Sequence, residues 1–175
     1  MHKTKYIFIF LLVSLLITMS AIKYFDKALQ NEVAPKGIVS FELAKNIKTS
    51  EAVLNSWNVT AKSFAGLSLG IDFLFLLLYA GFIAFSIYLL NSYLWNENLI
   101  MYQTGKLMMG AIILAAVFDA IENVALIRLL TGDLKQIWSS LAYYASTIKF
   151  SLVGLSILYL LINLIIYLYR KLIKP

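Results

Sequence analysis

A small group of charged and amide side chains interrupts the long apolar runs of this sequence, and their types could support chemistry. Asp72, Asp119, Glu122, Asn123 and Lys149 each lie within a run that is otherwise apolar. A charged side chain at the centre of a membrane helix costs about 2.5–3.5 kcal/mol on insertion scales, so it is usually kept for a partner or a function. Carboxylates beside an amine could bind a cation, a proton or a polar lipid headgroup. They could also divide the acid and base roles of an intramembrane enzyme.

Spacing and depth predict that these side chains meet. Asp119, Glu122 and Asn123 follow an i, i+3, i+4 pattern, so they share one face of a helix. Asp72 and Lys149 lie about five to seven residues after their runs begin, and Glu122 lies about eight before its run ends. In antiparallel helices rising about 1.5 Å per residue, these groups reach similar depth, ~8–12 Å from one membrane face.

Four apolar runs must position these residues, and each is long enough to cross a bilayer. They cover residues 6–22, 65–90, 107–130 and 144–169. The chain is 61% hydrophobic and 14% charged, which excludes an ordinary soluble domain. Backbone groups in lipid must bond internally, and the runs lack the alternation of barrel strands. We therefore expect an all-α polytopic membrane protein, a four-transmembrane-helix bundle forming one domain over residues 1–175.

The first run allows two interpretations. It follows a short basic tail and could be a secretory signal peptide cleaved after Ser20, with Thr18 at the −3 position. Its length is at the upper end for a signal peptide and just sufficient to span a membrane. The sequence favours a retained helix and leaves cleavage open.

The segment between the first two runs, residues 23–64, is predicted to form short amphipathic helices on the membrane surface. Its candidate helix caps are Ser40, Thr49 and Ser50. Apolar residues follow each cap at helical spacing. Glu42 and Trp57 of this segment could form a lid over the polar cluster.

Composition excludes several classes of site. The chain has no Cys, and its one His is His2, so disulfides, thiolate chemistry and bis-histidine haem are excluded. We expect no cofactor. A metal site made of carboxylates is disfavoured by the nearby Lys149. The net charge of +6 comes from Lys and Arg near the ends of the runs and in the long segment, which indicates contact with lipid headgroups and no nucleic-acid partner.

The basic tails predict an orientation. Lys3 and Lys5 precede the first run, and Arg170, Lys171 and Lys174 follow the last. An even number of spans places both tails on one side, and the positive-inside rule makes that side cytoplasmic. The lysines of segment 23–64 oppose this assignment.

Four motifs resemble a group of small bacterial four-helix membrane proteins of unknown function. They are FELA at residues 41–44, DFLF at 72–75, DAIEN at 119–123 and STIKF at 146–150. The resemblance covers most of the chain from Val39 onward. It implies an inner-membrane location and a polar signature consisting of Glu42, Asp72, Asp119, Glu122, Asn123 and Lys149. It implies no reaction.

Three hypotheses follow for these six residues, beside a purely structural role in which Lys149 neutralises Asp119 or Asp72. The first is a site for a small cation, a proton or a polar lipid headgroup; transport through so few helices would require a homo-oligomer. The second is an intramembrane enzyme acting on a lipid-like substrate, with Asp119 as proton donor and Lys149 stabilising negative charge. The third is an assembly partner whose outer faces matter most.

Overall fold

Six helices make up residues 2–173, the part of the chain that the computed structural model describes. They are α1 (His2–Asp26), α2 (Ile38–Glu42), α3 (Ile47–Ser56), α4 (Val59–Leu94), α5 (Leu99–Leu130) and α6 (Gln136–Ile173). No strand occurs in this part of the chain. Lys174 of the basic C-terminal tail and the side chain of His2 lie outside the description. The predicted all-α class is confirmed.

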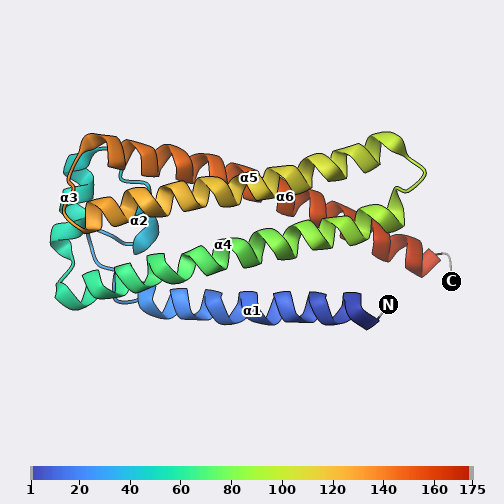
Figure 1. Ribbon diagram of the computed structural model, residues 1–175, viewed down its shortest axis with the longest axis horizontal. Helices are drawn as coiled ribbons and strands as arrows, with labels where there is room; N and C mark the ends of the chain where they lie inside the picture. Colours follow the sequence, from blue (N-terminus) through green and yellow to red (C-terminus); the bar gives the residue numbers. More distant parts are fainter. Residues whose placement is uncertain (1, 174–175) are drawn as a thin grey trace.

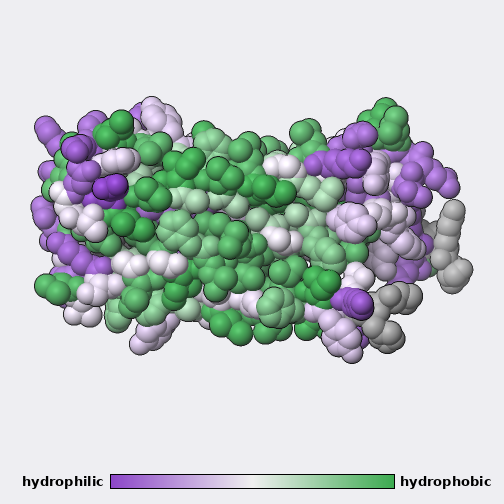
Figure 2. All heavy atoms as spheres, in the orientation of Figure 1, coloured by the Kyte–Doolittle hydropathy of each residue, from purple (hydrophilic) through white to green (hydrophobic). Residues whose placement is uncertain are grey.

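Four of these helices, α1, α4, α5 and α6, are long and apolar enough to cross a membrane. They lie lengthwise in the molecule, with apolar side chains around its middle and polar side chains at both ends (Figures 1 and 2). These features fit the predicted multi-pass bundle. α4, α5 and α6 begin earlier than their apolar runs, because polar side chains can extend a helix into the headgroup region. At the start of α4, for example, Asn58 accepts a hydrogen bond from the Ala61 amide over 2.8 Å.

The packing of the long helices is uneven. α5 packs extensively against both α4 and α6, whereas α1 packs along α4 alone. Much of α1 therefore presents its apolar side chains to the surroundings, as expected for a peripheral helix in lipid. Both described ends of the chain lie at the same end of the bundle, and α2 and α3 lie at the other (Figure 1).

The short helices α2 and α3 form a cap over that opposite end of the bundle. The residues at the N-termini of these two helices differ from the predicted N-cap residues. Asn46 caps α3 by accepting a hydrogen bond from the Thr49 amide over 2.9 Å. Ser50 instead donates its hydroxyl to the Ala44 carbonyl. Ser40 lies inside α2, which follows Gly37. Ser50 is buried, and its hydroxyl contacts the hydroxyl of Ser139 in α6. Because this tertiary contact engages the hydroxyl, Ser50 does not serve as the predicted N-cap.

An apolar core attaches the cap to the bundle. Phe41 and Trp57 meet edge to face with ring centroids 5.4 Å apart. The Trp57 indole donates to the Leu29 carbonyl over 2.8 Å, which ties α3 to the segment after α1. These side chains are continuous with buried residues of α4 and α5. The cap is thus held in a defined position, and α2 ends at Glu42, facing the bundle.

Candidate functional site

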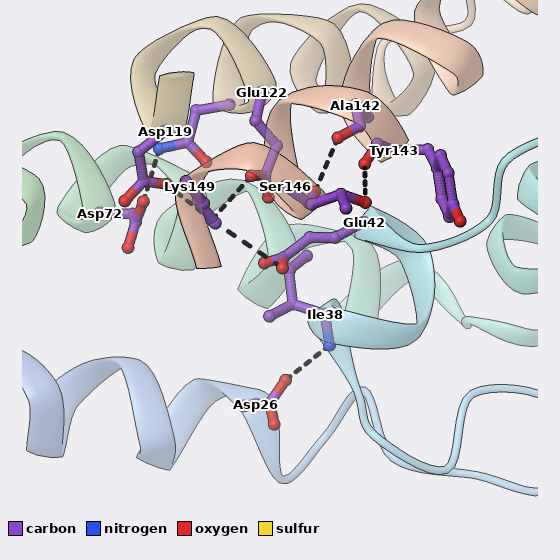
Figure 3. Close-up of polar contacts among 12 residues, drawn as sticks. Asp26, Ile38, Glu42, Asp72, Asp119, Glu122, Ala142, Tyr143, Ser146 and Lys149 are labelled. Atoms are coloured by element: carbon purple, nitrogen blue, oxygen red, sulfur yellow. Dashed lines mark hydrogen bonds and ion pairs between the residues drawn. The ribbon is translucent and has the colours of Figure 1, made fainter. Parts of the chain in front are cut away.

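Lys149 of α6 lies at the centre of a buried charge cluster. Its Nζ is 2.7 Å from Asp119 Oδ1, 2.8 Å from Glu122 Oε2 and 3.9 Å from Glu42 Oε2 (Figure 3). All four side chains are buried. Three elements, α2, α5 and α6, thus place their charges at one point. The arrangement matches the prediction that Lys149 faces several carboxylates.

The cluster continues through hydrogen bonds to α4. Tyr79 donates its hydroxyl to Asp119 Oδ2 over 3.0 Å, so both oxygens of Asp119 have a partner. The Asn123 amide donates to Asp72 Oδ2 over 2.6 Å. Among residues 2–173, Asp72 forms no ion pair. It therefore differs from Asp119, whose charge is directly balanced by Lys149.

The structure brings together all six residues that the sequence predicted for the site. They are Glu42, Asp72, Asp119, Glu122, Asn123 and Lys149. The i, i+3, i+4 spacing on α5 supplies one wall, and antiparallel packing places the residues from α4 and α6 at matching depth. The lid is only partly as predicted: Glu42 reaches the cluster, whereas Trp57 is buried in the core of the cap. Trp57 is a large apolar side chain with a partner for its indole, so it is more stable there than beside carboxylates.

Negative charge exceeds positive charge in this cluster. The cluster holds four carboxylates and one lysine. Glu42 Oε2 and Glu122 Oε1 are buried without a hydrogen-bond partner among the described residues, whereas Glu122 Oε2 lies 2.8 Å from Lys149 Nζ. Burial raises the pKa of Glu42 above its ordinary value, although the nearby Lys149 opposes this rise. Leaving buried acceptors unsatisfied costs about 1–3 kcal/mol each. The cluster is therefore more acidic than a structural ion pair would require.

A pocket of about 380 Å³ adjoins the cluster. Its polar end is formed by Glu42, Asp72, Asp119, Asn123 and Lys149, together with Ser68 and Tyr79. The other walls are apolar and come from α1, α2, α4 and α6; they include Leu15, Met19, Ile22, Ile38, Val39, Phe75, Ile83, Val153 and Ile157. The pocket has no signature in the sequence, because its walls consist of ordinary apolar residues.

From the exposure of its lining, we place the opening of the pocket between α1 and α6. These two helices both line the pocket, but they do not pack face to face. Lining residues on both sides are partly exposed: Met19 of α1 by 47%, and Phe150 and Ile157 of α6 by 46% and 39%. In a bilayer this opening faces lipid. A ligand could therefore enter from within the membrane.

Lys149 limits the chemistry that the cluster can perform. Its Nζ occupies the point among the carboxylate oxygens where a metal ion would otherwise lie. Within residues 2–173, no group of three His, Cys, Asp or Glu side chains is arranged to hold a metal ion. The lysine is also fully engaged with carboxylates, so it is poorly placed to stabilise a negative charge developing on a substrate. The arrangement suits binding better than catalysis.

A second polar layer near the other end of the bundle was not predicted. The buried Asn91 amide of α4 donates to the Tyr102 carbonyl of α5 over 3.0 Å, and Asn91 Oδ1 accepts from the Tyr159 hydroxyl over 3.2 Å. Gly105 provides the space, since a Cβ there would collide with the Asn91 side chain. The available signal was an amide side chain directly after the second apolar run, which ends at residue 90. These contacts join α4, α5 and α6, and they are structural.

Neither a protein-family model, nor a curated protein, nor a solved structure matches this chain. The resemblance drawn from the four short motifs therefore stays a prediction.

Proposed function

We propose that this protein binds a membrane-resident amphiphile, with the ligand's polar headgroup at the cluster and its apolar part in the pocket between α1, α4 and α6. The observation that supports this function is the division of the pocket. One end carries the carboxylates, the lysine and hydroxyl groups, and the remaining walls are apolar. Ligand pockets commonly have mostly apolar walls with a few polar groups that orient the ligand.

A small cation or a proton is the second candidate ligand. It is supported by the excess of carboxylates and by Glu42 Oε2 and Glu122 Oε1, which have no hydrogen-bond partner among the described residues. Neither ligand needs the apolar walls, however, and a pocket of about 380 Å³ falls within the range of small-molecule sites. The shape of the pocket therefore favours an amphiphile. Binding requires no oligomer, whereas transport through four helices would.

The proposal requires that α1 remain part of the mature protein. Leu15, Met19 and Ile22 of this helix form one wall of the pocket. Cleavage after Ser20 would remove much of that wall and expose the cluster. We therefore propose a retained helix, which the intact N-terminal sequence of the membrane-extracted protein, read by mass spectrometry, would support.

We further propose a location in a bacterial inner membrane with both termini in the cytoplasm. The location follows the motif resemblance. The orientation follows the basic residues Lys3, Lys5, Arg170 and Lys171, which flank the outermost helices at one end of the bundle. A C-terminal fluorescent-protein fusion should be fluorescent, and a C-terminal alkaline phosphatase fusion should be inactive. The reverse pattern would contradict the orientation.

Photolabelling can test the amphiphile site directly. The purified protein in nanodiscs would be exposed to a long-chain alcohol that carries a diazirine on its alkyl chain, and labelled peptides mapped by mass spectrometry. We expect saturable labelling of α1 and α6 at the pocket, competed by excess dodecanol. Val153→Phe should fill the pocket and abolish this labelling, whereas Leu155→Phe, at a residue 55% exposed on the same helix and outside the pocket, should not. Labelling that is non-saturable and unaffected by Val153→Phe would contradict the proposal.

A further inference from the structure

We infer that the headgroup bound here is a hydrogen-bond-donating cation, such as the ammonium group of a long-chain amine, held by Asp72 and Glu42. The inference rests on the proposed amphiphile site and specifies its ligand class. It follows from which carboxylates lack a hydrogen bond from a cation and which of them line the pocket.

Asp72 is the first of these carboxylates. Its carboxylate accepts a hydrogen bond from the neutral side-chain amide of Asn123 over 2.6 Å. Lys149 is already in contact with Asp119 and Glu122 at 2.7 and 2.8 Å. Asp72 lines the pocket from α4 and is less buried than the other carboxylates. An ammonium group entering the pocket would supply the charge and the hydrogen bonds that Asp72 lacks.

Glu42 is the second carboxylate that lines the pocket and lacks a hydrogen bond from a cation. It is only 7% exposed, and its Oε2 has no hydrogen-bond partner among the described residues, although Lys149 Nζ lies 3.9 Å away. Glu42 lines the same pocket, and Figure 3 shows it and Asp72 on either side of Lys149. A buried acceptor of this kind is costly unless something satisfies it. A bound ammonium group has donors enough for both carboxylates.

The charge balance argues against an anionic headgroup. The cluster holds four carboxyl groups, Glu42, Asp72, Asp119 and Glu122, and a single lysine, Lys149. An added carboxylate or phosphate would meet repulsion from these acids, because three of them already pair with Lys149 Nζ. An added cation reduces the net charge of the buried cluster.

The route of entry fits an alkylamine. The opening between α1 and α6 faces lipid, and the apolar walls run from that opening to the carboxylates. An alkyl chain would contact Leu15, Phe75 and Val153 while its headgroup reaches Asp72. A hydrophilic cation without a chain would gain nothing from these walls.

Three photoprobes with the same diazirine-bearing alkyl chain separate this inference from the proposed function. They end in an amine, an alcohol and a carboxylic acid. In the wild-type protein in nanodiscs, we expect the amine to label the pocket at the lowest concentration, about tenfold or more below the alcohol, with the acid weakest. Asp72→Asn and Glu42→Gln should each remove this preference for the amine. Glu97→Gln, the same chemical change at an exposed residue, should leave it intact.

Each outcome is decisive. Saturable labelling of the pocket by all three probes with equal affinity, or strongest labelling by the acid, would overturn the cation assignment and leave the amphiphile site standing. An absence of saturable labelling by any probe would overturn both. The wild-type comparison needs no variant, so a folding defect in Asp72→Asn would not weaken the test.

Discussion

Lys149 Nζ lies 2.7 Å from Asp119 Oδ1, and this buried ion pair joins α6 to α5 within the apolar part of the bundle. Tyr79 of α4 donates to the other Asp119 oxygen, so the pair connects three helices. Removing one partner of a buried pair leaves the other without compensation, which is far more costly than removing both.

Lys149→Met should therefore strongly destabilise the protein. Asp119, Glu122 and Glu42 would be left as buried carboxylates without a cation, and we expect a loss of about 3–5 kcal/mol in unfolding free energy. Denaturant unfolding in detergent, followed by circular dichroism, would measure the change. Lys135→Met removes a lysine at the exposed α5–α6 turn and should have little effect. Equal effects of the two substitutions would contradict the central role of Lys149.

Two aspartates of the cluster should respond oppositely to neutralisation. Asp119→Asn removes a partner of Lys149 and should lower stability. Asp72→Asn removes a carboxylate that has no ion pair, and the new amide oxygen can still accept from Asn123. We expect its stability without ligand to be unchanged or higher, as at residues kept for function at some cost to stability. Thermal melting of both variants tests this; marked destabilisation by Asp72→Asn would indicate a structural role.

Glu42 should make stability depend on pH. Burial raises its pKa in the folded state above the ordinary value of 4.5, so between these two values the folded protein binds more protons than the unfolded chain. The contribution of Glu42 is therefore fully present below pH 4.5 and is lost as the pH rises through its folded-state pKa. Melting temperatures from about pH 4.5 to pH 8 should fall less steeply for Glu42→Gln than for the wild type or Glu97→Gln. Parallel curves would show that Glu42 is not held in an environment that disfavours its charge.

Gly37 directly precedes α2, the helix that carries Glu42. Its φ of 55° lies in the left-handed region, and a Cβ there would collide with the Asp26 carboxylate, which accepts from the Ile38 amide over 2.7 Å. Gly37→Ala should cost about 1–3 kcal/mol and displace α2 with Glu42. Gly70→Ala, in helix α4 with open space around its Cβ position, should be neutral or stabilising by up to about 1 kcal/mol. Thermal melting of the two variants measures the difference, and equal stabilities would contradict the strain at Gly37.

The membrane helices and the cluster were predictable because both follow from periodicity and depth. Glu122 and Asn123 share a helix face by spacing alone, and Lys149 reaches them because adjacent antiparallel helices place equal depths together. The contact between Asp72 and Asn123 requires in addition only that α4 packs against α5, as neighbouring antiparallel helices usually do.

Other features depended on tertiary packing and could not be predicted. Ser50 was a reasonable helix cap until Ser139 of α6, distant in sequence, paired with its hydroxyl. The buried Asn91 contact depends on the close approach of Gly105. The pocket exists because α1 packs on α4 and leaves a gap beside α6. The sequence of a peripheral apolar helix does not indicate which of the other helices it will pack against.

A cationic amphiphile that binds in the pocket should stabilise the folded protein. The most direct test is the melting temperature of the wild-type protein in nanodiscs that contain increasing amounts of dodecylamine, with dodecanoic acid as the matched anion. Ligand that binds the folded state at about 100 times its Kd adds about 2.7 kcal/mol of stability. We predict a saturable rise in Tm with dodecylamine that is lost in Asp72→Asn and retained in Glu97→Gln. A Tm that is insensitive to dodecylamine, or that rises equally in Asp72→Asn, would contradict the account.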